Sequence, residues 1–230
     1  MDVISHLATL NSTLAHELDL LRNVSFVRSL FIAFLAIFLK SSSSLVYMAK
    51  RAFLIHGWEG YPEEGWRPWL KSQLEKSGFT VIVPAMPDTK HPTLSAWLGC
   101  LAKTVGTPDS ECYFVGHSLG CITILRYLES IPQEVGGAVL VAGFSSNLGY
   151  DELESFFTKP IDWELIRKNC KKFVAIHSDN DKFVSLHYAD IFKEKLGADV
   201  VVQHDMKHFS GSDGVMELPA ARDAVLSLTK

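Results

Sequence analysis

The sequence predicts an α/β fold with a mostly parallel six-stranded sheet and helices on both faces. Three observations lead to this prediction. From Lys50 onward, short apolar segments alternate with longer helix-like segments, which is typical of repeated strand–helix units. The strand-like segments are continuously apolar, as in a parallel sheet covered on both faces. One of them runs directly into the turn Gly116-His117-Ser118-Leu119-Gly120 and then into a helix-like segment.

The predicted elements follow one another in a regular order. Each predicted strand is a short apolar run, at residues 51–56, 80–83, 112–115, 138–142, 172–176 and 200–203. The predicted helices are the longer segments that follow these strands, near residues 67–76, 94–104, 119–130, 162–169, 186–195 and 217–228. Six such units, without internal repeats, predict one domain over residues 48–230.

The five residues from Gly116 to Gly120 have the pattern G-x-S-x-G between a strand and a helix. Such a turn holds its serine in a strained backbone conformation, and the flanking glycines let strand and helix approach closely. It raises the Ser118 hydroxyl above the sheet edge, and the next helix points its positive N-terminus at the same place. The context therefore makes Ser118 a candidate nucleophile.

A serine hydroxyl needs a neighbouring base, and the base needs an acid that orients it. In chains with this turn, the acid comes next and the histidine last. Two acids, Asp179 and Asp181, follow the fifth predicted strand, and two histidines, His204 and His208, follow the sixth. Both turns lie at carboxyl ends of strands, where parallel sheets place ligand sites. Alternation cannot separate the two acids, because residues two apart share a face while a strand continues.

Cleavage of an acyl group also needs hydrogen-bond donors for the oxyanion that develops. The backbone N–H of Leu119, directly after the serine, is one expected donor. The second is expected from the loop after the first predicted strand, where the N–H of Trp58 follows His56-Gly57. His56 itself is expected only to form hydrogen bonds within that loop.

Several separated motifs resemble those of one family. They are Ile55-His56-Gly57-Trp58, Trp66-Arg67-Pro68-Trp69-Leu70, Met86-Pro87-Asp88, His117-Ser118-Leu119-Gly120-Cys121, Pro160-Ile161-Asp162-Trp163-Glu164 and Ser178-Asp179-Asn180-Asp181. From about Met48 onward the chain is similar to the YdeN-type, retinoblastoma-binding-protein-9-like small serine hydrolases of the α/β-hydrolase superfamily. The resemblance implies a trimmed α/β-hydrolase with a minimal lid, a Ser-Asp-His triad, and no cofactor or metal.

The resemblance also ranks the candidate acids and bases. The spacing of Asp181 and Val184 resembles the D-x-x-V acid turn of α/β-hydrolases, so Asp181 is the leading acid and Asp179 the second. The sequence H-F-x-G that begins at His208 resembles the histidine loop of small hydrolases, so His208 leads over His204. Metal binding by the two histidines is the competing interpretation. It is disfavoured because this segment leaves a strand and no glutamate follows His204.

Composition fits one globular domain in a chain of 230 residues. Hydrophobic residues make up 47%, enough for a sizeable core, and a net charge of −4 without a basic patch argues against a nucleic-acid partner. No C-x-x-C motif occurs, so neither a zinc site nor a disulfide framework is expected. The four scattered cysteines are Cys100, Cys112, Cys121 and Cys170. A reduced, cytoplasmic location is therefore expected.

Residues 1–47 differ in character and are predicted to be an appendage outside the catalytic fold. Residues 24–39 are almost wholly apolar, but they are fewer than the ~20 residues that a membrane-spanning helix needs. They suit a signal or anchor sequence, an amphipathic membrane-contacting helix, or sequence upstream of a natural start at Met48. The last is favoured, because Met48 directly precedes the first strand. Membrane contact, and hence a membrane-associated location as the alternative to the cytoplasm, is expected only through residues 24–39.

The predicted function is that of a serine hydrolase, most simply a carboxylesterase acting on a small ester, thioester or amide through an acyl-enzyme. Ser118 would attack the small acyl substrate, His208 would act as base and then acid, and Asp181 would orient His208. A serine peptidase or amidase is the alternative among enzymes. The alternative from another class is a catalytically idle scaffold that binds a protein partner, whose identity the sequence does not indicate.

Overall fold

The structure, a computed structural model, describes residues 49–230. The predictions for residues 1–47, including the apolar segment 24–39, lie outside the described residues. All six predicted strands and six predicted helices occur within residues 49–230, and their bounds differ from the prediction by at most two residues. None of the helices in this part of the chain is long and apolar enough to cross a membrane.

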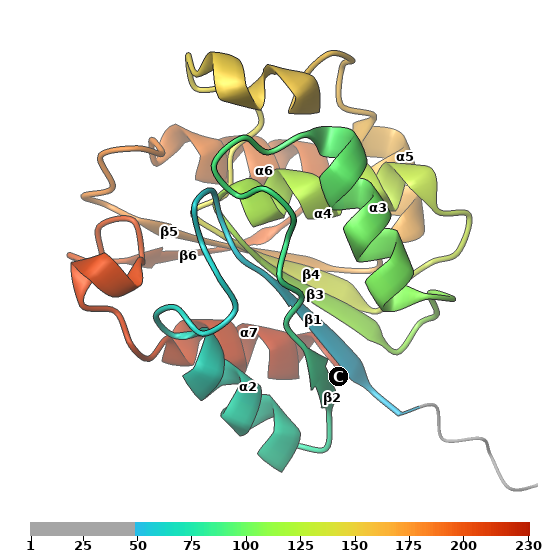
Figure 1. Cartoon of the computed structure of the whole chain (residues 1–230). Helices are drawn as coiled ribbons and strands as arrows, with labels where there is room; N and C mark the ends of the chain where they lie inside the picture. The colour runs from blue at the N-terminus through green and yellow to red at the C-terminus, as the bar shows by residue number, and fades with distance from the viewer. Residues whose placement is uncertain (1–48) are drawn as a thin grey trace, which may run out of the picture. The chain divides into compact units, whose positions relative to one another are not determined.

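The strands form one six-stranded parallel sheet in the order β2-β1-β3-β4-β5-β6 (Figure 1). Their bounds are β1 Arg51–Ile55, β2 Thr80–Ile82, β3 Cys112–His117, β4 Gly137–Val141, β5 Phe173–Ser178 and β6 Asp199–Gln203. Every pair of neighbouring strands is parallel, so all six carboxyl ends meet at one edge of the sheet. This topology confirms the predicted fold class.

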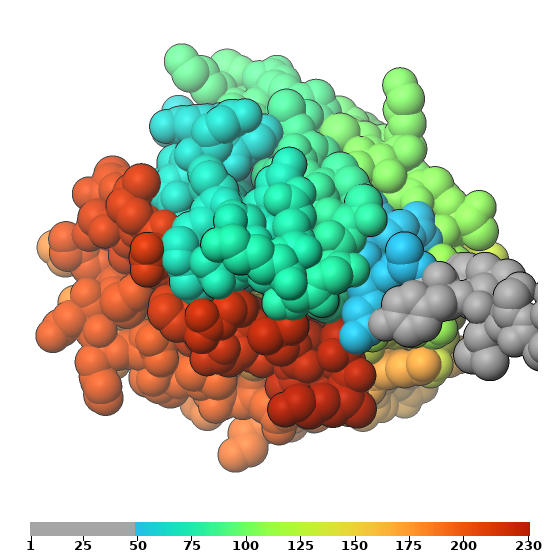
Figure 2. All heavy atoms as spheres, turned by 90° about the horizontal axis from the view of Figure 1, so that it is seen from below, coloured from blue at the N-terminus to red at the C-terminus, as the bar shows by residue number. Residues whose placement is uncertain are grey.

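Helices cover both faces of the sheet. Their bounds are α2 Arg67–Lys76, α3 Leu94–Val105, α4 Leu119–Ser130, α5 Trp163–Asn169, α6 His187–Leu196 and α7 Pro219–Leu228. In Figure 1, α3, α4, α5 and α6 lie above the sheet, whereas α2 and α7 lie below it. Figure 2 looks onto the lower face, where the surfaces of α2 and α7 lie side by side.

Each face of the sheet has its own apolar cluster. On the upper face, Trp97 of α3, Ile124 of α4 and Phe192 of α6 belong to one cluster of buried side chains. On the lower face, Leu70 of α2 and Val225 of α7 belong to the other. Burial of such a side chain stabilises the fold by about 1.5–3 kcal/mol. The two clusters therefore fix the helices against the sheet and make its carboxyl edge a rigid platform.

Coverage of the sheet is complete only at its centre. The strands β3, β4 and β5 are buried along their whole length. At the edges, Thr80 of β2 and both Asp199 and Val202 of β6 are exposed. The structure thus differs from the expectation that every strand is covered, because an edge strand has a neighbouring strand on one side only.

Residues 143–160, between β4 and α5, form a short cap that contains the 3-10 helix η1 (Asp151–Phe156). The cap lies above the upper helices in Figure 1. Its base is held by the buried guanidinium of Arg126 in α4, which donates to the backbone oxygens of Phe156 (2.9 Å) and Pro160 (3.2 Å). The cap is therefore short and fastened to the domain, as the predicted minimal lid requires.

Candidate active site

Ser118 lies in the sharp turn between β3 and α4, with a positive φ of 53°. That conformation is rare for a residue with a side chain, as expected for the strained serine of this motif. A Cβ at Gly116 would lie 2.7 Å from the amide nitrogen of Cys121, and one at Gly120 would overlap the carbonyl oxygen of Ile55. The turn forms because both flanking positions lack a side chain.

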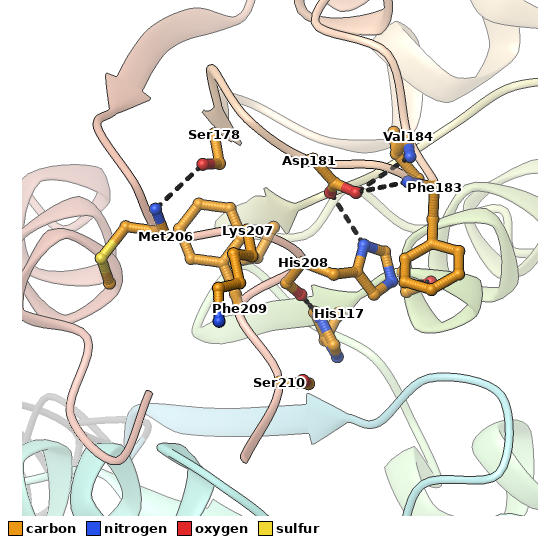
Figure 3. Close-up of polar contacts among 12 residues, drawn as sticks. His117, Ser178, Asp181, Phe183, Val184, Met206, Lys207, His208, Phe209 and Ser210 are labelled. Carbon is orange, nitrogen blue, oxygen red and sulfur yellow. Dashed lines mark hydrogen bonds and ion pairs between the residues drawn. The ribbon is translucent and has the colours of Figure 1, made fainter. Parts of the chain in front are cut away.

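The structure brings Ser118, His208 and Asp181 together in one chain of hydrogen bonds. His208 Nε2 lies 3.0 Å from Ser118 Oγ. On the other side of the ring, His208 Nδ1 lies 2.8 Å from Asp181 Oδ2 (Figure 3). The side chain of Asp181 is 2% exposed and that of His208 is 16% exposed. An ionised carboxylate can only accept, so His208 Nδ1 carries the hydrogen and Nε2 is left to accept the Ser118 proton.

The turn after β5 gives the physical reason for the spacing of Asp181 and Val184. The second carboxylate oxygen, Asp181 Oδ1, accepts the amides of Phe183 at 2.8 Å and Val184 at 3.0 Å (Figure 3). Val184 is itself buried in the upper apolar cluster. The turn is thereby anchored in the core, and the carboxylate is held with Oδ2 toward His208.

The two second-ranked candidates, Asp179 and His204, pair with each other. Asp179 Oδ2 lies 2.5 Å from His204 Nδ1, and Asp179 Oδ1 accepts the amide of Asp205 at 3.1 Å. Their hydrogen bond lowers the pKa of Asp179 and raises the pKa of His204. The His204 side chain is 86% exposed, so the pair joins the loops after β5 and β6 at the surface. Among residues 49–230, no group of three or more His, Cys, Asp or Glu side chains is arranged to hold a metal ion.

Side chains from three other segments hold the backbone of the loop that carries His208. Four backbone amides of the loop donate to side-chain oxygens: those of Met206 to Ser178 Oγ (3.1 Å), of Lys207 to Asn180 Oδ1 (2.8 Å), of His208 to Asp213 Oδ2 (3.1 Å) and of Gly211 to Glu64 Oε1 (3.0 Å). Lys207 and Phe209 have positive φ values of 49° and 58°. Such conformations cost of order 1–3 kcal/mol each, so the loop keeps its shape only because these contacts stabilise it.

Two residues of the site, His117 and Trp66, were not among the sequence candidates. His117 Nε2 lies 2.7 Å from the backbone oxygen of His208, and Trp66 Nε1 donates to the backbone oxygen of Phe209 at 2.9 Å. Both side chains are buried. Burial, followed by the nearby His208 ring, holds the pKa of His117 well below its usual range. The sequence signals were the presence of both residues in motifs of the family resemblance and the place of His117 directly before the candidate nucleophile.

The backbone amides of Trp58 and Leu119 belong to residues that line the same cleft as Ser118. Within residues 49–230, neither N–H donates to another protein atom, so both are available to a ligand. His56 forms the expected hydrogen bond within its loop and a second one outside that loop, to the segment after β2. Its Nδ1 donates to the adjacent backbone carbonyl at 2.9 Å, and its Nε2 accepts the amide of Met86 at 3.1 Å. Burial lowers the pKa of His56, in keeping with this neutral ring.

Ser118 opens into a cleft of about 1020 Å³. The cap and the loop after β5 supply an apolar wall, whose residues are Phe144, Leu148, Tyr150, Leu153, Phe183 and Val184. The loop after β1 supplies Glu59 and Glu63, both exposed, and no lysine or arginine lines the cleft in the described chain. Four of the six large exposed apolar side chains of the described residues also line it, namely Tyr61, Tyr150, Phe183 and Met216. The exposed apolar surface is therefore concentrated at the cleft.

Comparison with known families agrees with this geometry. The sequence profile described as serine hydrolase matches residues 52–227. The chain belongs to the serine hydrolase family. Its matched region extends from β1 into α7 and includes Ser118, Asp181 and His208.

Two relatives of this serine hydrolase confirm the resemblance found from the motifs. YdeN of Bacillus subtilis (strain 168) is 32% identical over 184 residues, which cover 78% of this chain and 96% of YdeN. The serine hydrolase RBBP9 of Rattus norvegicus is 30% identical over 153 residues, which cover 65% of this chain and 80% of RBBP9.

Solved structures agree with the fold of this serine hydrolase. The crystal structure of the ydeN gene product from B. subtilis matches with a TM-score of 0.75 at 30% identity, covering 78% of this chain and 98% of that one. Est1E from Butyrivibrio proteoclasticus matches with a TM-score of 0.63 at 16% identity, covering 79% of this chain and 88% of Est1E. At that identity, the likeness to Est1E shows a shared fold only.

Proposed function

We propose that this serine hydrolase cleaves small carboxylic esters through an acyl-enzyme, with Ser118, His208 and Asp181 as its catalytic triad. The observation that carries the proposal is the unbroken chain of hydrogen bonds from Asp181 through His208 to Ser118. It ends at a strained serine that opens into a large cleft. This arrangement is the one that nucleophilic acyl transfer requires.

Acylation begins when Ser118 Oγ attacks the carbonyl carbon of the ester while His208 Nε2 takes the hydroxyl proton. A carbon–oxygen bond forms, and the carbonyl electron pair moves onto the oxygen. The amides of Trp58 and Leu119 stabilise that oxyanion, and one such donor contributes on the order of 10²–10³ in kcat. The bond to the leaving alcohol then breaks, and the alcohol oxygen takes the proton from His208.

Deacylation repeats these steps with water as the nucleophile. His208 Nε2 takes a proton from the water, whose oxygen attacks the acyl carbon, and the proton returns to Ser118 Oγ as the carboxylic acid leaves. In both steps the positive charge on the His208 ring is stabilised by the Asp181 carboxylate 2.8 Å away. The buried position of Asp181 keeps this interaction shielded from water.

The lining of the cleft favours a substrate whose acyl group is uncharged and apolar. Its cap wall is apolar, and the loop after β1 adds Glu59 and Glu63 without a lysine or arginine among the described lining residues. A substrate with a carboxylate or phosphate near the reacting carbonyl would meet like charge there. Simple neutral esters are therefore the substrates that this geometry supports best.

Labelling with a fluorophosphonate, which reacts with activated serines, tests the proposal directly. We expect the wild-type protein to be labelled and to hydrolyse p-nitrophenyl butyrate. Ser118→Ala should abolish both the labelling and the hydrolysis while the protein stays folded. The matched control is Ser146→Ala, because Ser146 lies outside the hydrogen-bonded chain and bonds Tyr188 instead.

The alternatives give different results in the same assays. Faster hydrolysis of aminoacyl or peptidyl arylamides than of matched esters would favour a peptidase or amidase. Absence of labelling in a folded wild-type protein would favour a protein-binding scaffold without catalysis. Labelling that persists in Ser118→Ala would show that another residue is the nucleophile.

A further inference from the structure

Two consecutive carbonyl groups of the histidine loop are held by ring N–H groups from distant elements. The backbone oxygen of His208 lies 2.7 Å from Nε2 of His117, which ends β3. The backbone oxygen of Phe209 lies 2.9 Å from Nε1 of Trp66, which directly precedes α2. The His117 and Trp66 rings also contact each other edge to face, with centroids 6.0 Å apart. Two buried aromatic side chains, His117 and Trp66, therefore hold this loop by hydrogen bonds to its backbone.

The hydrogen bond of His117 also defines the protonation of its ring. A carbonyl oxygen can only accept, so Nε2 of His117 must carry the hydrogen. The ring is 4% exposed, and its centroid lies 5.1 Å from that of the His208 ring. A second positive charge at this distance would oppose the imidazolium that forms on His208 during catalysis. A neutral His117 with hydrogen on Nε2 is therefore the form compatible with both its contact and the reaction.

We infer that His117 is a positioning residue that sets the base His208 against the nucleophile Ser118. His117 is joined to Ser118 by a peptide bond, and its side chain holds the backbone of His208. One residue thus links the two reacting groups, which approach within 3.0 Å although 90 residues separate them along the chain. The inference rests on the proposed function, because it concerns the geometry of the same proton transfer.

The loop needs such a contact because its own conformation is strained. Both neighbours of His208, Lys207 and Phe209, have positive φ values. The amide of His208 is held by Asp213 at 3.1 Å, but its carbonyl is held only by His117 among the described residues. Without that bond the peptide unit after His208 is held only through its N–H, which belongs to Phe209 and donates to the Met206 oxygen at 2.9 Å. A displacement of about 1 Å can reduce catalysis by about 100-fold.

A matched pair of amide variants tests the inference. His117→Gln can place an amide N–H near the position of the imidazole Nε2, whereas His117→Asn ends one methylene short of the His208 carbonyl. We expect kcat on p-nitrophenyl butyrate to fall by about 10- to 100-fold in His117→Asn. KM should stay within about twofold of the wild-type value, because His117 borders the cleft but, at 4% exposed, offers a substrate little surface. His117→Gln should recover most of the lost kcat.

Urea unfolding of both variants provides the control for folding. Equal kcat values for His117→Asn and the wild type would overturn the inference. Equal losses of kcat in His117→Asn and His117→Gln, with both variants folded, would overturn it as well. A loss confined to KM would place His117 in substrate binding instead. If His117→Asn does not fold, Trp66→Phe removes the companion donor alone and should lower kcat in the same way; an unchanged kcat there would also count against the inference. An inactive wild-type protein would instead refute the proposed function, and the positioning role with it.

Discussion

His177 offers a quantitative test of how burial acts on a histidine in β5, four residues before Asp181. It lies in β5, is 1% exposed, and its Nε2 has no hydrogen-bond partner among residues 49–230. Burial lowers the pKa of His177 to about 4, against the smaller opposing effect of Asp181 and Asp190. The folded protein therefore keeps this ring neutral at pH values where the unfolded chain would bind a proton.

The sign and size of the effect follow from linkage. Between the folded value of about 4 and the unfolded value of 6.5, unfolding takes up a proton, so stability falls as the pH falls through 6.5. For a single group with these values, the loss between pH 7 and pH 5 is about 2 kcal/mol. The loss ends below the folded pKa, where it totals about 3 kcal/mol.

The perturbation is His177→Leu, which removes the titrating group and puts an apolar side chain of similar volume in its place. The free energy of unfolding in urea is measured at pH 7 and pH 5 for both proteins. The wild type should lose about 2 kcal/mol more than the variant between the two pH values. Comparing the change between the two pH values in the two proteins cancels any effect of the substitution that does not depend on pH. It also cancels the contributions of His56 and His117 to the pH dependence, because both proteins contain these residues.

His91→Gln is the control, because the His91 side chain is 80% exposed. It should leave the pH dependence of the wild type unchanged. The same loss of stability in His177→Leu and in the wild type would refute the reasoning, since burial of His177 would then have no effect on proton binding.

Three further predictions concern the site and the chain organisation. Asp181→Asn should lower kcat for ester hydrolysis by about 10⁴-fold, whereas Asp179→Asn should stay within about twofold; the reverse ranking would overturn the choice of acid. An ester with a carboxylate on its acyl group should have a lower kcat/KM than its neutral analogue, because Glu59 and Glu63 line the cleft; equal values would contradict this. A protein beginning at Met48 should fold and be labelled by fluorophosphonate, whereas its aggregation would show that residues 1–47 cover part of the domain.

The sheet and the nucleophile turn could be predicted from the sequence because their signals are local. Central strands of a parallel sheet are covered on both faces, so each appears as a continuous apolar run in consecutive residues. The glycines at 116 and 120 are required by contacts with Cys121 and Ile55. The G-x-S-x-G pattern shows both requirements within five positions, although the contact at Gly120 is with Ile55 of β1, a strand distant along the chain.

The sequence alone did not show which of two acids and which of two histidines belong to the site, and a family resemblance ranked them. The tertiary structure supplies the physical reason for their different places. Asp181 has one oxygen held by the amides of its own turn and the other facing His208. Asp179, two residues earlier and chemically identical, is exposed and pairs with His204. Which carboxylate meets which imidazole depends on how two loops from neighbouring strands are packed.

The supporting residues were determined by the tertiary structure in the same way. The hydrogen bond from His117 spans 91 residues, and the one from Trp66 spans 143. No pattern along the chain indicates either hydrogen bond, because each depends on the distance between folded segments and not on neighbours in the sequence. The sequence by itself thus determined the strands, the helices and the turn that carries Ser118. Only the folded chain decided which side chains hold His208 in place, since a hydrogen bond requires two atoms to lie within about 3 Å.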